Sequence, residues 1–133
     1  MTISKGTAII LASAARTASP ANVEINKSTV GISLGAVTNI DIIVDVTATA
    51  DTPSLTVAIQ AKDPASGELY DLLAGIAAIT TTSTVIYQIG KDVVDAAGLA
   101  ANTSIPDEVV LKFTHADTDS ITYSVGMNCE FDK

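Results

Sequence analysis

Polar and apolar side chains alternate along two stretches near the C-terminal end of the chain. From Ile121 to Phe131 every second residue is apolar, and the residues between them are Thr, Ser, Gly, Asn or Glu. The same alternation runs from Val109 to Phe113. A period of two gives one apolar and one wet surface only when the chain is an extended strand. Because residues 116–120 are mostly Asp, Thr and Ser, which favour turns, we expect an antiparallel hairpin with one buried face.

Residues 39–49 carry the next strong strand pattern. Ile40 and every second residue up to Val46 are apolar and fall on one face. The opposite face is polar except for Ile43, which indicates partial cover by a neighbouring segment. Shorter strands are expected from the same kind of pattern at 7–12, 22–26, 54–61, 69–73 and 84–89.

Turn-forming residues separate these strands. Pro64 and Gly67 lie in one short polar segment, so we expect a tight connection between two antiparallel strands there. Residues 27–35 are rich in Gly, Ser and Thr and are expected to loop across the surface. Helix competes with other structure only in residues 91–101. Because Gly98 weakens a helix, we expect a loop there with at most one or two helical turns.

The pattern as a whole predicts an all-β fold. We expect an antiparallel β-sandwich or jelly-roll-like fold with about eight short strands and at most one short helix. No linker or change of composition divides the chain, so residues 1–133 are expected to form a single domain. Residues 1–20 are expected to serve as an N-terminal contact arm, because a small apolar segment ahead of the first firm turn can reach outward.

Composition narrows the function. Hydrophobic residues make up 47% of the chain but aromatic residues only 4%, so the core is expected to consist mainly of Val, Ile, Leu and Ala. The net charge of −8 argues against nucleic acid as a partner, because polyanions repel such a surface.

No apolar run is long enough for a membrane helix, and the N-terminal residues lack the features of a signal peptide. The lone Cys129 cannot form an internal disulfide and is expected to be a small buried residue.

Catalytic chemistry finds little support in the sequence. His115 is the single histidine, and Asp117 and Asp119 could orient it, but no nucleophile motif accompanies it. Phosphate-binding glycine loops are missing, and nothing places two carboxylates across a cleft for glycoside hydrolysis. We therefore expect no catalytic residues, no cofactor and no enzymatic activity.

Metal binding rests on three acidic residues. One histidine and one cysteine are too few for a transition-metal site. Asp117 and Asp119, with Asp51 on another turn, offer hard oxygen ligands and are the calcium candidates. The segment lacks the spacing of a helix-loop-helix calcium site, so ordinary turn-forming acids are the alternative interpretation.

Several segments resemble small β-sandwich virion proteins encoded by tailed bacteriophages. The most distinctive strings are Lys-Asp-Pro-Ala-Ser-Gly at 62–67 and Asp-Ser-Ile-Thr-Tyr-Ser-Val-Gly at 119–126. Weaker matches lie at 11–20, 43–48, 52–54, 61, Tyr70, Leu72, Leu73 and 114–118. Residues 27–39 depart from the pattern of the family, so a role particular to this protein is expected for that loop.

The resemblance implies a structural component of the virion, made in the cytoplasm of the host bacterium. The first expectation is a head decoration (cement) protein that binds the outer surface of the capsid and braces neighbouring major capsid subunits. A tail, neck or fibre-associated structural protein is the alternative, followed by a host-surface carbohydrate-binding module. The family carries no catalytic residues to transfer.

Contacts with other proteins are expected through Arg16 and through apolar residues that a lone sandwich does not fully cover. The candidates lie in the N-terminal segment and on the strand at 39–49. They are Ile9, Ile10, Leu11, Arg16 and Ile43. Ordinary core filling is the competing interpretation for the apolar ones. The expected partners are the major capsid protein and further copies of the chain, with a trimer at a local three-fold position preferred to a dimer.

Overall fold

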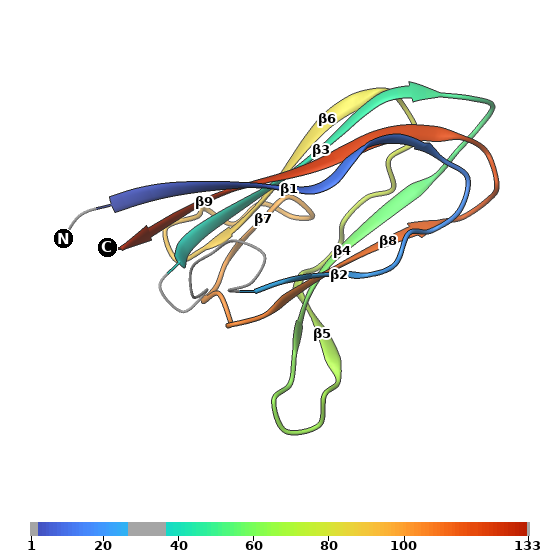
Figure 1. The fold of residues 1–133 in the computed structure, drawn as a ribbon. Coiled ribbons are helices and arrows are strands. Elements are labelled where there is room, and N and C mark those ends of the chain that lie inside the picture. The colour runs from blue at the N-terminus through green and yellow to red at the C-terminus, as the bar shows by residue number, and fades with distance from the viewer. Residues whose placement is uncertain (1–2, 27–36, 133) are drawn as a thin grey trace.

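The computed structural model describes residues 3–26 and 37–132, and these ranges contain nine strands and no helix (Figure 1). The strands are β1 (Ile3–Arg16), β2 (Val23–Ile25), β3 (Val37–Thr49), β4 (Leu55–Lys62), β5 (Leu69–Leu73), β6 (Ser83–Gly90), β7 (Ala100–Asn102), β8 (Val109–His115) and β9 (Ile121–Asp132). The predicted all-β class is therefore confirmed, with nine strands where about eight were expected.

The strands form two sheets that face each other (Figure 1). One sheet has five strands in the order β1-β9-β3-β6-β7, and the other has four in the order β2-β8-β4-β5. Neighbouring strands are antiparallel, except that β6 and β7 run parallel. This arrangement is the predicted β-sandwich.

The core lies between the sheets and follows the alternation of the sequence. On β3, Ile42 and Val44 are fully buried, whereas Ile43 between them is only half-buried. On β9 the apolar positions from Ile121 to Cys129 are all buried. Burying a large aliphatic side chain contributes roughly 1.5–3 kcal/mol, so the inward rows supply most of the stability. Cys129 is free and buried, as predicted.

The predicted hairpin between β8 and β9 is wrong. Both strands exist, but β8 pairs with β2 and β4, whereas β9 pairs with β1 and β3 in the other sheet. Residues 116–120 therefore cross from one sheet to the other, beside residues 50–54, which also cross. Backbone hydrogen bonds tie the two crossings together: Ala50 N donates to Ser120 O (2.9 Å), and Ala116 N donates to Ser54 O (3.1 Å). An alternating pattern does not distinguish a hairpin from such a crossing, because both turn their apolar faces to the core.

The tight connection between β4 and β5 is confirmed. Asp63 N donates to Glu68 O and Gly67 N donates to Asp63 O, each at 2.8 Å, and Gly67 has a φ of 77° that favours glycine. The Asp63 carboxylate accepts hydrogen bonds from Ala65 N (2.8 Å) and Ser66 Oγ (3.0 Å), which lower the pKa of Asp63. This hairpin projects from the body of the sandwich (Figure 1).

The N-terminal segment, which is the expected contact arm, contains strand β1. β1 is longer than the predicted strand at 7–12, and it pairs with β9 from Ile3 to Arg16. It lies at the edge of the five-stranded sheet, and two register shifts between Ile9 and Ala14 interrupt the pairing. Such irregularities are one way in which proteins protect an edge strand from further pairing.

Two other predictions concern loops. Residues 91–101 contain hydrogen-bonded turns and the start of β7 but no helix, as expected, and Gly98 has a φ of 72°. The loop expected at 27–35 lies outside the described residues.

Candidate functional site

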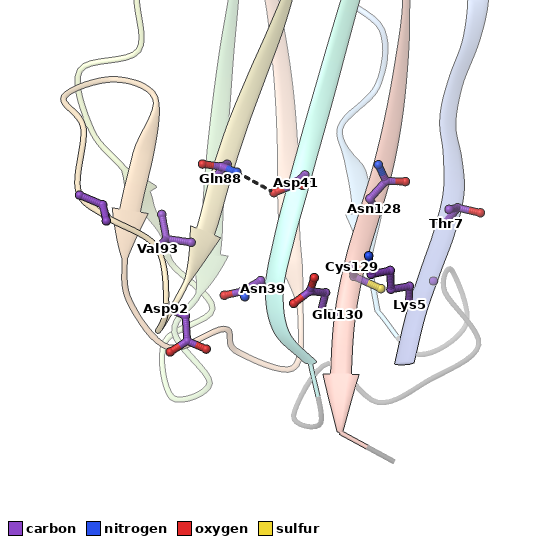
Figure 2. Close-up of a pocket in the computed structure, with 12 residues that line it drawn as sticks. Lys5, Thr7, Asn39, Asp41, Gln88, Asp92, Val93, Asn128, Cys129 and Glu130 are labelled. Atoms are coloured by element: carbon purple, nitrogen blue, oxygen red, sulfur yellow. Dashed lines mark hydrogen bonds between the residues drawn. The ribbon is translucent and has the colours of Figure 1, made fainter. Parts of the chain in front are cut away.

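A polar hollow of about 620 Å³ lies on the outer face of the five-stranded sheet (Figure 2). The hollow follows from the register of the strands. Paired residues of β1, β9, β3 and β6 lie side by side in rows on this face. One such row is formed by Thr7, Asn128, Asp41 and Gln88. The neighbouring row is formed by Lys5, Glu130, Asn39 and Gly90. Asp92 and Val93, which follow β6, close one side.

The hollow is acidic. Asp41, Asp92 and Glu130 line it, and Lys5 is the one cation among its described lining residues. Gln88 Nε2 donates to Asp41 Oδ1 at 3.4 Å, which joins β6 to β3 across the floor (Figure 2). A site of this charge favours cationic groups over anionic ones.

Cys129 is among the residues that line the hollow. Cys129 is 4% exposed, and burial raises the pKa of its thiol, so the thiol stays protonated at neutral pH. Asn39 Oδ1 is buried without a hydrogen-bond partner and lies where a Cβ on Gly90 would be. Gly90 is therefore required by close packing. The hollow offers polar contacts and negative charge, and its geometry suits binding better than covalent chemistry.

The calcium candidates lie on the two crossing connections. Asp119 Oδ2 accepts hydrogen bonds from Thr52 N (3.2 Å) and Thr52 Oγ1 (3.3 Å), and Asp117 Oδ1 accepts one from Asp119 N (3.1 Å). The structure thus brings the turn that contains Asp51 next to the turn that contains Asp119. These bonds fix the connections to each other. Within residues 3–26 and 37–132, no group of three or more His, Cys, Asp or Glu side chains is placed to hold a metal ion.

His115 belongs to a cluster that joins both sheets. Its Nε2 lies 3.0 Å from the hydroxyl of Tyr123, and its backbone N donates to Ser19 Oγ at 2.9 Å. Burial lowers the pKa of His115, and the positive charge of Arg16 lowers it further, whereas Asp117 acts in the opposite direction. The hydrogen-bond partner of the imidazole is thus the hydroxyl of Tyr123, and the imidazole is neutral at pH 7.

Arg16, an interface candidate, packs inside the same cluster. Its guanidinium carbon lies 4.5 Å from the centre of the Tyr123 ring, a cation–π contact. Its Nη1 donates to Tyr123 O (2.7 Å) and its Nη2 donates to Ala12 O (2.7 Å). These bonds fasten the end of β1 to β9, so the guanidinium is engaged within the chain.

The other four interface candidates divide by face. Ile10 and Leu11 pack against the core, so core filling is the correct interpretation for them. Ile9 is 81% exposed, and Ile43 points out of the same sheet face and is half-buried. The structure adds Ile86, which is 49% exposed on β6. Alternation within residues 84–89 places Ile86 on the polar face, and this signal in the sequence could have identified it.

A scan against protein-family models finds no match to this chain, and a search of curated proteins finds none either. Among the residues that the structure describes, no helix has the length and apolarity needed to cross a membrane.

Proposed function

We propose that the chain is a structural protein of a bacteriophage virion, and more specifically a capsid decoration (cement) protein. It binds the outer surface of the head and stabilises neighbouring major capsid subunits. The observation that carries the proposal is the outer face of the five-stranded sheet. On that face the apolar side chains of Ile9 and Ile86 are exposed to solvent. An exposed apolar surface of this kind is typical of protein–protein contacts.

The segments that resemble tailed-phage virion proteins supply the second line of support. Residues 62–67 form the projecting β4–β5 connection, and residues 119–126 join one crossing connection to the centre of β9. These parts of the chain are two connections and half of a central strand. The resemblance therefore concerns the scaffold and its role as a building block.

We further propose that the protein is trimeric and is seated at a local three-fold position of the shell. β7 lies at the edge of the five-stranded sheet opposite the interrupted strand β1, and its pairing with β6 has no register shift. The backbone groups of an edge strand can pair with a second subunit. Sedimentation velocity of the purified protein tests this assembly, and a monomer at all concentrations contradicts it.

The function is tested by mixing the purified protein with empty expanded shells of the phage that encodes it. The expected result is saturable co-sedimentation with the shells and a higher temperature of shell disruption. No binding to shells, together with binding to purified tails, contradicts decoration and favours the tail, neck or fibre alternative. Cryo-electron microscopy of intact particles then locates the protein directly.

A further inference from the structure

Four outward residues form an apolar row across the five-stranded sheet. Ile9 of β1 is opposite Gly126 of β9, Gly126 is opposite Ile43 of β3, and Ile43 is opposite Ile86 of β6. We call Ile9, Gly126, Ile43 and Ile86 the isoleucine row. Its side chains point away from the core, because their strand neighbours, such as Ile42, Val44 and Tyr87, are the buried ones.

Gly126 leaves a notch in this row. The atom nearest to a Cβ added at Gly126 is Ala8 O at 4.0 Å, so no side chain within residues 3–26 and 37–132 crowds that position. Strands are about 4.8 Å apart, so the backbones on either side of the notch are separated by roughly 10 Å, enough for one inserted side chain. Glycine weakens the interior of a strand, and such a glycine often marks a close approach by another molecule. Gly126 also lies beside the register shift between Ile9 and Leu11, and no atom of the described residues crowds its position.

Carboxylates border the row on both sides. Asp41 lies in the row of Thr7, Asn128 and Gln88, and Asp45 lies in the row of Ser124 and Thr84 on the other side of Ile43. Asp45 Oδ1 accepts a hydrogen bond from Thr84 Oγ1 (3.0 Å), and Asp41 Oδ1 accepts one from Gln88, so both are held on this face. A second copy stacked on the face would bring like charges together, which disfavours that pairing.

We propose that the isoleucine row docks a protein surface on which a protruding apolar side chain is flanked by Lys or Arg. The apolar side chain enters the notch at Gly126 between Ile9 and Ile43. The flanking cations meet Asp41 and Asp45. The inference rests on the proposed function in one respect, because the partner surface is taken to belong to the major capsid protein.

Three variants test the docking face with the same empty expanded shells as the probe. Gly126→Val fills the notch with a residue that suits strands. The triple change Ile9→Thr, Ile43→Thr and Ile86→Thr removes apolar surface and keeps β-branched side chains. Asp41→Asn with Asp45→Asn removes both charges and keeps an oxygen acceptor for each hydrogen bond. Circular dichroism and thermal unfolding show that each variant is folded before binding is measured.

The first two variants are expected to weaken shell binding by about tenfold or more, which corresponds to about 1.4 kcal/mol. The double Asn variant is expected to bind more weakly at low salt and to lose most of the salt dependence of the affinity. The matched control is Leu69→Thr with Tyr70→Thr on β5, which removes exposed apolar surface from the other sheet. This control is expected to bind like the unaltered protein.

Different results overturn different statements. If the unaltered protein binds shells and Gly126→Val and the triple Thr variant bind equally well, the docking face is wrong and the proposed function stands. Loss of binding in the β5 control alone would assign docking to the projecting hairpin. If the row variants convert an oligomer to a monomer in sedimentation velocity, the row meets a second copy and the inference fails. Absence of shell binding by the unaltered protein removes both the function and the docking face.

Discussion

The outer faces of the two sheets differ in character although the inner faces are alike. On the five-stranded sheet, an apolar row lies between rows that contain Asp41 and Asp45. On the four-stranded sheet, charges of both signs are mixed. Glu24 is paired with Val110, Lys112 with Ala58 and Gln60 with Asp71, and Gln60 Nε2 donates to Asp71 Oδ1 at 3.1 Å. The inward residues of both sheets are apolar because they form the core. The outward residues do not have this requirement, so differences between them reflect what each outer face contacts.

The largest expected effect is a difference in stability between an inward and an outward substitution on β3. Ile42→Ala removes a fully buried side chain of β3 and should lower the free energy of unfolding by about 3 kcal/mol. Ile43→Ala, the adjacent outward change, should cost less than about 1 kcal/mol, because part of its side chain is already in water. Urea titration of both variants measures the difference. Equal losses would show that Ile43 is a core residue and would remove the contrast between the faces.

A smaller effect is expected at the cluster that joins the sheets. Tyr123→Phe removes the hydroxyl that lies 3.0 Å from His115 Nε2 and should lower the free energy of unfolding by about 1 kcal/mol. Tyr70→Phe is the matched control, because Tyr70 is 49% exposed on β5 and should lose almost nothing. Thermal unfolding of the two variants compares them. A larger loss from Tyr70→Phe would mean that the projecting hairpin has a structural role.

Two glycines of the five-stranded sheet are expected to respond in opposite directions. Gly126→Ala should raise the free energy of unfolding by about 0.5–1 kcal/mol, because the new Cβ has room and the unfolded chain loses freedom. Gly90→Ala should lower it, because the Cβ would strike Asn39 and the backbone of Thr38. Chemical denaturation of both proteins gives the signs. A loss of stability in Gly126→Ala would indicate that the notch is needed by the fold.

The smallest effect is a dependence on pH. The pKa of His115 is lowered on folding from 6.5 by burial and by Arg16. The unfolded chain therefore binds more protons below pH 6.5, and stability should decrease as the pH falls through 6.5 toward the folded value. Unfolding midpoints between about pH 7.5 and about pH 5 measure this slope. His115→Gln is the control in which the slope should flatten, and an unchanged slope would exclude His115 as its origin.

Local sequence was sufficient to predict the class and the faces of the strands. The period of two on β3 and β9 follows from the need of each strand to bury one side, so Ile42 and Val125 were placed correctly. Pairing could not be obtained in this way. β8 and β9 satisfy the same alternation whether they form a hairpin or belong to opposing sheets, and only long-range hydrogen bonds such as Ala50 N to Ser120 O decide between them.

The candidate site was predictable only in part for the same reason. Ile43 was recognised as an apolar residue on a polar face, and Ile9 was recognised within an apolar run. Their alignment with Gly126 and Ile86 depends on the register of three strand pairs, which no single segment contains. The sequence does not show that Arg16 binds Tyr123 within the chain, because the two residues are 107 positions apart.

The place of β9 has a consequence for how the protein forms. β9 lies between β1 and β3, so the first of the nine described strands has its sheet neighbour in the last (Figure 1). β1 must wait with its inward side chains Ala8 and Ile10 uncovered by β9 until the whole sandwich sequence has been synthesised. Contacts of such long sequence separation slow folding and expose intermediates to aggregation. Assembly of the five-stranded sheet is therefore expected to follow the synthesis of β9, and β1 is exposed to aggregation in the interval.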